Sequence, residues 1–154
     1  MAKKEGIRKL FNNIAGDYDR LNHILSLNID KSWRRKAVKE IADSVEPLNI
    51  LDEACGTCDF TIEIAKAASQ GSNVTGIDLS ERMLQIGREK CCKEGITAEL
   101  QTGDCEAMPY KDETFDRIGV AFGVRNFENL PKGLTEMLRV LKPEGKLVIL
   151  ELSI

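Results

Sequence analysis

The sequence predicts an α/β fold: a doubly wound parallel sheet of order 3-2-1-4-5 with a helical N-terminal arm. Three observations support this prediction. Apolar segments of strand length alternate with segments of helical spacing roughly every 20–25 residues after Pro47. Right-handed crossovers favour the doubly wound order, with a ligand crevice at the carboxyl ends of strands 1 and 4. The 154 residues, 42% apolar and 31% charged, suffice for one hydrophobic core.

We divide the chain into an arm or lid, residues 1–45, and a sheet domain, residues 46–154. The arm is expected to be helical because apolar residues recur on one face at helical spacing before Pro47: Trp33, Ala37, Val38, Ile41, Ala42 and Val45. Strands are expected at residues 49–52, 73–78, 98–102, 115–122 and 146–152. Helices are expected around residues 62–68, after a cap at Ser80, and from Asn129 and Pro131 to Leu141. A turn is expected at residues 143–145.

The charges are unevenly distributed. The formal net charge of −3 gives a nucleic-acid partner no electrostatic support. Residues 1–45 hold ten Lys/Arg against six Asp/Glu, or +4, and the remainder holds twelve against nineteen, or −7. A basic arm suits anionic lipid head groups, although a solvated helix face explains the same charges more simply. We see no signal peptide and no membrane-spanning run, so we expect a cytoplasmic protein, with peripheral contact at the inner membrane face left open.

The five cysteines are expected to be free thiols, since their number is odd and no export signal precedes them. Cys55 and Cys58 form a C-x-x-C at a strand-to-helix turn, which is where a thioredoxin-like redox pair would lie. That interpretation leaves the Asp78 and Arg125 segments unexplained, so we expect reduced, non-catalytic thiols. A zinc site would need two more ligands at suitable spacing, and His23 is the only histidine. We therefore expect no metal.

The first strand-to-helix turn, residues 51–60, is the first candidate site. Small residues around Gly56 allow a ligand to approach the backbone closely. Asp78 follows Gly56 by twenty-two residues, at the end of the second expected strand, where an acid can bind a ribose diol. A loop with one glycine serves a pyrophosphate poorly, so a nucleoside without phosphates fits better. S-adenosylmethionine is such a ligand, while an ordinary tight turn with a surface Asp is the structural alternative.

A third element strengthens this hypothesis. Residues 103–109 follow the third expected strand. Asp104 there can accept a hydrogen bond from an adenine amino group, and Cys105 offers a backbone N–H nearby. Three such elements, each at the carboxyl end of a strand, are unlikely to arise by chance.

With these motifs, the chain resembles the class I methyltransferases, whose sheet is Rossmann-like. More narrowly, it resembles the ubiquinone/menaquinone biosynthesis C-methyltransferase family. Two stretches carry the closer resemblance. They are residues 11–22 (FNNIAGDYDRLN), with Leu25–Leu27 and Trp33-Arg34 after them, and residues 121–127 (AFGVRNF). The resemblance extends over residues 11–152.

The resemblance implies that the chain binds S-adenosyl-L-methionine. The implied contacts lie in the loops and at the ends that follow the first four expected strands: Gly56, Thr57, Asp78, Asp104, Cys105 and Ala121. The chain departs from the family at Cys58, where many relatives have Gly. It departs again at Ala121, where some relatives have a Ser that touches the cofactor. The first departure puts the tightness of the turn in doubt.

The implied reaction is C-methylation of a polyprenylated quinol, either demethylmenaquinol or the benzoquinol precursor of ubiquinone. Arg125 follows strand 4 beside the crevice and is our candidate to stabilise the phenolate; pairing with Glu128 is its alternative role. Asp19, or a water held by Tyr18, is our candidate to take the proton, and packing of the arm explains Tyr18 equally well. A class I methyltransferase for another small molecule, or a non-catalytic S-adenosylmethionine-binding module, remains an alternative.

The end of the sequence carries one more expectation. Class I methyltransferases usually have two further strands after strand 5. Because the sequence stops at Ile154, we expect a truncated chain whose sheet lacks both strands. Strand 5 would then have a free edge of unpaired N–H and C=O groups. We expect self-association through residues 146–154, or fraying there, and cofactor binding that exceeds turnover.

Overall fold

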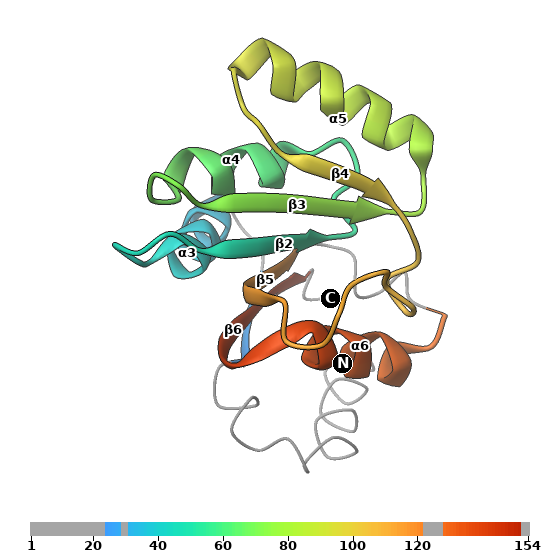
Figure 1. The fold of residues 1–154 in the computed structure, drawn as a ribbon. Helices are drawn as coiled ribbons and strands as arrows, with labels where there is room; N and C mark the ends of the chain where they lie inside the picture. The colour runs from blue at the N-terminus through green and yellow to red at the C-terminus, as the bar shows by residue number, and fades with distance from the viewer. Residues whose placement is uncertain (1–23, 29–30, 122–127, 152–154) are drawn as a thin grey trace.

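The sheet has the predicted order. The computed structural model describes residues 24–28, 31–121 and 128–151. Six parallel strands are ordered β1-β6-β5-β2-β3-β4 (Figure 1), so the order 3-2-1-4-5 predicted for the last five strands is confirmed. In chain order the elements are β1 (Ile24–Asn28), α3 (Lys31–Ala42), β2 (Asn49–Glu53), α4 (Asp59–Ala67), β3 (Asn73–Asp78), α5 (Glu81–Glu94), β4 (Glu99–Thr102), β5 (Phe115–Ala121), α6 (Leu130–Val140) and β6 (Leu141–Glu151).

Helices cover both faces of the sheet, as the strand-helix alternation predicted (Figure 1). On one face α3 and α4 pack on β2 and β6, through Ile41 and Phe60 against Ile50 and Val148, and α5 packs beside α4. On the other face α6 packs through Leu134, Met137 and Leu138. The inner strands β2, β3 and β5 are therefore largely buried on both sides, as parallel strands usually are, whereas the edge strand β4 is mostly exposed. Both predicted helix caps are confirmed: Ser80 accepts from the N–H of Met83, and Asn129 from that of Lys132.

The prediction that the first 45 residues are wholly helical is wrong. Residues Ile24–Asn28 form β1, which pairs in parallel with β6 from Ile24↔Leu147 to Asn28↔Glu151. The helical periodicity belongs to α3 alone, where Ala37, Val38, Ile41 and Ala42 are buried, while Val45 lies beyond the helix and is 93% exposed. The described part of the arm is thus built into the sheet domain.

The pairing of β1 also corrects the expectation of a free edge on β6. Residues 147–150 have a paired strand on each side, β1 and β5, and Glu151 is paired with β1. The premise for self-association or fraying through residues 146–154 is therefore wrong for the described part of that segment. β1 supplies hydrogen-bond partners for the backbone groups that a free edge of β6 would expose to solvent.

The turn predicted at residues 143–145 lies inside a strand. β6 begins at Leu141, paired with Phe115, and its register then shifts so that Lys146 pairs with Arg117. The extra residues form a bulge opposite Asp116. The Pro and Gly in this segment mark an interruption of the pairing rather than a boundary of the strand.

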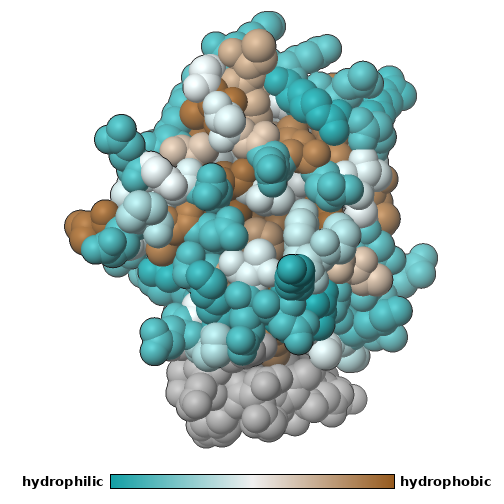
Figure 2. Space-filling model, in the orientation of Figure 1, coloured by the Kyte–Doolittle hydropathy of each residue, from teal (hydrophilic) through white to brown (hydrophobic). Residues whose placement is uncertain are grey.

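Hydrophilic side chains cover most of the face shown in Figure 2, with apolar ones in small patches between them. The most exposed large apolar side chains are Val45, Leu79, Met83 and Ile86. Within the described residues, no helix is long and apolar enough to cross a membrane.

Candidate functional site

The loop after β2 has an unusual backbone. Ala54, Gly56 and Cys58 all have positive φ, at 53°, 55° and 72°. The turn closes when the N–H of Cys58 donates to the carbonyl of Cys55 at 2.9 Å. A left-handed φ costs a residue with a side chain roughly 1–2 kcal/mol of conformational free energy. The backbone conformation of this loop is therefore unfavourable for Ala54 and Cys58 and depends on the surrounding structure. Such strain is common where a backbone must present itself to a ligand.

Asp78, at the end of β3, holds this loop in place. One of its carboxylate oxygens accepts from the N–H of Gly56 and the other from the N–H of Ser80, both at 2.9 Å. The same residue thus joins the loop after β2 to the start of α5. Its predicted contact with a ribose stays a prediction, but the structure places the half-buried carboxylate at the carboxyl edge of the sheet, beside Gly56.

The loop after β4 lies next to Asp78, as the strand order requires. The N–H of Gly103 donates to the carbonyl of Asp78 at 3.0 Å. Asp104 is exposed and Cys105 is buried. The Asp104 carboxylate accepts from the N–H of Glu106 at 2.8 Å, which fixes its direction. The structure therefore brings together three of the predicted positions: Gly56, Asp78 and Asp104.

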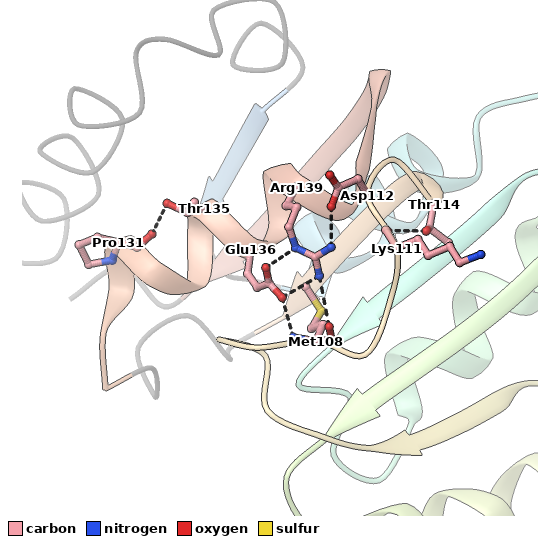
Figure 3. Close-up of polar contacts among 8 residues, drawn as sticks. All are labelled: Met108, Lys111, Asp112, Thr114, Pro131, Thr135, Glu136 and Arg139. Carbon is pink, nitrogen blue, oxygen red and sulfur yellow. Dashed lines mark hydrogen bonds and ion pairs between the residues drawn. The ribbon is translucent and has the colours of Figure 1, made fainter.

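An ion-pair network fastens the rest of this loop to α6 (Figure 3). Glu136 accepts from the N–H of Met108 at 2.6 Å, and Arg139 donates to the carbonyl of Met108 at 3.2 Å. Arg139 also bonds to Glu136 and to Asp112. The pKa of Glu136 is lowered because Arg139 hydrogen-bonds its carboxylate. The network limits the freedom of the segment that carries Asp104 and Cys105.

A cavity of about 160 Å³ opens between the carboxyl ends of β2 and β5. Two predicted residues, Thr57 and Ala121, line it. The remaining lining residues are Arg34, Asp52, Ala54, Cys55, Asp59 and Phe60. The Thr57 hydroxyl accepts from Lys90 at 3.0 Å. Pockets that hold whole ligands usually have volumes of roughly 300 Å³ or more, so the described residues enclose room for only part of a nucleoside cofactor.

Two adjacent acids at the end of β2 are fully buried. Asp52 is 1% exposed and accepts from the Thr61 hydroxyl at 2.5 Å; burial raises its pKa to about 8. Glu53 is 0% exposed, and neither of its oxygens has a hydrogen bond of normal geometry among the described residues, although the Cys105 thiol interacts with its carboxyl group. Burial raises the pKa of Glu53 well above its ordinary value. Both side chains therefore favour the protonated form.

The C-x-x-C cysteines are close but not bonded. Their sulfurs are 3.9 Å apart, against about 2.05 Å in a disulfide, and all five cysteines are free. The sulfur contact raises the pKa of Cys55 and lowers that of Cys58 to about 7. In the described part of the chain, no group of three His, Cys, Asp or Glu side chains could hold a metal ion.

Three predicted catalytic residues, Arg125, Tyr18 and Asp19, lie outside the described residues. Conversely, sequence reasoning missed Arg34, which lines the cavity, and Leu79, which follows Asp78 and is 71% exposed. Leu79 had a detectable signal, because an apolar residue directly after a ribose-binding acid can lie against a base.

Known proteins resemble this chain over nearly its whole length. The model of the ubiE/COQ5 methyltransferase family matches residues 1–154. A demethylmenaquinone methyltransferase from Bacteroides fragilis is 50% identical over 98% of this chain and 62% of its own length. The ubiquinone/menaquinone biosynthesis C-methyltransferase UbiE from Geobacter sulfurreducens is 45% identical over 98% of this chain and 59% of its own length. The chain thus spans about three fifths of these relatives. Among solved structures, a SAM-dependent methyltransferase from Aquifex aeolicus is similar with a TM-score of 0.64 and 26% identity, covering 79% of this chain and 72% of that one.

Proposed function

Since the chain belongs to the ubiE/COQ5 methyltransferase family, we propose that it takes part in transfer of a methyl group from S-adenosyl-L-methionine to a ring carbon of a polyprenylated quinol. The single observation that carries the proposal is the convergence of Gly56, Asp78 and Asp104 at the carboxyl edge of the sheet. The relatives named for demethylmenaquinone and for ubiquinone/menaquinone biosynthesis support the quinol as acceptor. We favour demethylmenaquinol.

The described residues fit this cofactor. Gly56 lies at a loop that a ligand can approach, since a side chain added there would meet nothing within 4 Å. Asp78 and Asp104 offer carboxylates to a ribose and to an adenine amino group. The exposed Leu79 offers an apolar surface to the base. When bound, the cofactor supplies an electrophilic methyl group on a sulfonium, so the protein's task is orientation and activation of the acceptor.

Activation of the acceptor is assigned to residues from the motifs of the family. We propose that the Arg125 guanidinium stabilises the phenolate form of the quinol, because it stays cationic at any working pH. We propose that Asp19, or a water held by Tyr18, takes the hydroxyl proton. A polyprenyl tail partitions into lipid, so we also propose that the basic segment before residue 46 contacts an anionic membrane surface.

Replacing Asp78 by alanine is expected to weaken cofactor binding at least tenfold, or roughly 1.5 kcal/mol, since a charged acceptor is lost and the N–H of Gly56 loses its partner. Calorimetry with S-adenosylhomocysteine on wild type and variant measures this loss. Glu89→Ala removes an exposed carboxylate from α5 and is the control. Equal affinities for wild type and Asp78→Ala would remove Asp78 from the site.

Methyl transfer itself is tested with cofactor labelled in the methyl group and demethylmenaquinol in vesicles. We expect label in the quinol ring, and more of it with anionic than with neutral vesicles. Label that goes only to another small acceptor would indicate a different class I methyltransferase. Tight cofactor binding without transfer to any acceptor would indicate a binding module instead.

A further inference from the structure

Arg34 is the feature of this site that the proposed roles leave unused. It lies on α3, away from the strand ends that carry the predicted residues, yet its side chain reaches the cavity beside Asp52, Thr57 and Ala121. Of the described residues that line this cavity, Arg34 is the only cationic one. A guanidinium at the wall of a small polar cavity is suited to bind a carboxylate.

Arg34 is paired with Glu63 but keeps hydrogen-bond donors for a further anion. Burial raises the pKa of Asp52 to about 8, so this carboxyl favours the neutral form at neutral pH. Asp59 pairs with Lys90 at 3.0 Å. Glu63, on α4, receives two contacts from Arg34 at 3.0 and 3.1 Å, and its side chain is 41% exposed. A guanidinium carries five N–H donors, so the contacts to Glu63 leave donors for a second anion.

The size of the cavity indicates which part of the cofactor it holds. A volume of about 160 Å³ is too small for a nucleoside with its amino-acid tail. The adenosine part is already assigned to the Asp78 and Asp104 side of the edge. What remains of S-adenosylmethionine is its aminoacyl end, whose carboxylate is the only negative charge on the molecule.

We propose that Arg34 binds the carboxylate of the cofactor's aminoacyl end, with Glu63 fixing the guanidinium from the solvent side. This inference rests on the proposed function, since it presupposes S-adenosylmethionine in this crevice. It makes α3 part of the cofactor site, and it makes the packing of α3 on the sheet a condition for binding.

The test compares two ligands that share the adenosine and the sulfur but differ in the aminoacyl end. S-adenosylhomocysteine has the carboxylate, and methylthioadenosine lacks it. For Arg34→Gln we expect at least a tenfold loss of affinity for S-adenosylhomocysteine and less than a twofold change for methylthioadenosine. Arg35→Gln, which removes an exposed charge from the next position of the same helix, is the matched control and should change neither affinity.

The outcomes separate this inference from the proposed function. If the wild type binds neither ligand, the proposed cofactor is wrong and the inference falls with it. If the wild type binds both and Arg34→Gln weakens neither, or weakens both equally, only the role of Arg34 is wrong. Glu63→Gln loosens the hold on the guanidinium but keeps its charge, so it should lower the affinity for S-adenosylhomocysteine by less than Arg34→Gln does and leave the affinity for methylthioadenosine within about twofold. An equal loss for both ligands would reveal a purely structural ion pair and overturn the assignment.

Discussion

Replacing Glu53 by leucine is expected to raise the free energy of unfolding by roughly 1–3 kcal/mol at pH 7, the usual cost of burying a polar group without a good hydrogen bond. Glu53 is 0% exposed, and its oxygens have no hydrogen bond of normal geometry among the described residues, where the Cys105 thiol is the polar side chain that interacts with them. In the sheet it is in register with Ile77 on β3 and Val120 on β5, which are both fully buried. A leucine of similar size suits such surroundings, whereas an unpartnered acid is costly there.

The sign of the pH dependence follows from the raised pKa of Glu53. Above its ordinary pKa of 4.5 the unfolded chain releases the proton while the folded chain retains it. The folded state then binds more protons, so the free energy of unfolding falls as pH rises, by roughly 1.4 kcal/mol per pH unit until the folded pKa is reached. The wild-type protein has the full contribution of protonated Glu53 to its stability below pH 4.5. The gain of Glu53→Leu in free energy of unfolding over wild type should therefore be largest at high pH.

Urea unfolding of wild type and variants from pH 5 to pH 8 measures this effect. Thermal scans should show a rise in melting temperature of roughly 2–12 °C for Glu53→Leu at pH 7. Glu53→Gln keeps a buried polar group but cannot ionise, so it should flatten the pH dependence with a smaller gain. Glu89→Gln, at an exposed position on α5, is the control and should stay within about 0.5 kcal/mol. A wild-type stability that does not fall with pH more steeply than that of Glu53→Leu would contradict the prediction.

The sheet could be predicted from the sequence because β2, β3 and β5 are short apolar runs separated by helices. β1 could not, because its five residues pair with β6, far along the chain, and nothing local distinguishes them from helix. The turn predicted at residues 143–145 was wrong for another reason. A bulge inside a strand and a turn between two elements both favour Pro and Gly, so the sequence does not distinguish them.

In the candidate site, too, some residues could be predicted from the sequence and others could not. Gly56, Asp78 and Asp104 each follow a strand, so the topology alone brings them to one edge. The place of Arg34 depends on how α3 packs on the sheet, which periodicity does not give. The burial of Glu53 could not be predicted from its residue type, since Glu is almost never fully buried without a partner. Sequence reasoning therefore finds residues tied to strand ends better than residues defined by tertiary packing.

Replacing Gly87 by alanine is expected to destabilise the protein by about 2–3 kcal/mol, although alanine is favoured over glycine in a helix by roughly 1 kcal/mol. Gly87 lies in α5 against the loop after β2. A Cβ there would lie 2.4 Å from the sulfur of Cys58 and 3.1 Å from its Cβ. Cys58 is fully buried with φ of 72°, so its side chain has little room to move aside.

Cys58→Gly should rescue Gly87→Ala. Glycine removes the sulfur that blocks position 87 and accepts the left-handed backbone at lower cost, so the double variant should lie within about 1 kcal/mol of wild type. Denaturant unfolding of the four proteins in the cycle should therefore give a coupling energy of about 2 kcal/mol. Gln85→Ala, at an exposed position of the same helix, controls for helix propensity.

Additive effects of the two substitutions would show that the close approach of α5 to the loop after β2 does not govern the cost of Gly87→Ala. A coupling of the expected size would show that Cys58 is tolerated in this turn because α5 has a glycine facing it.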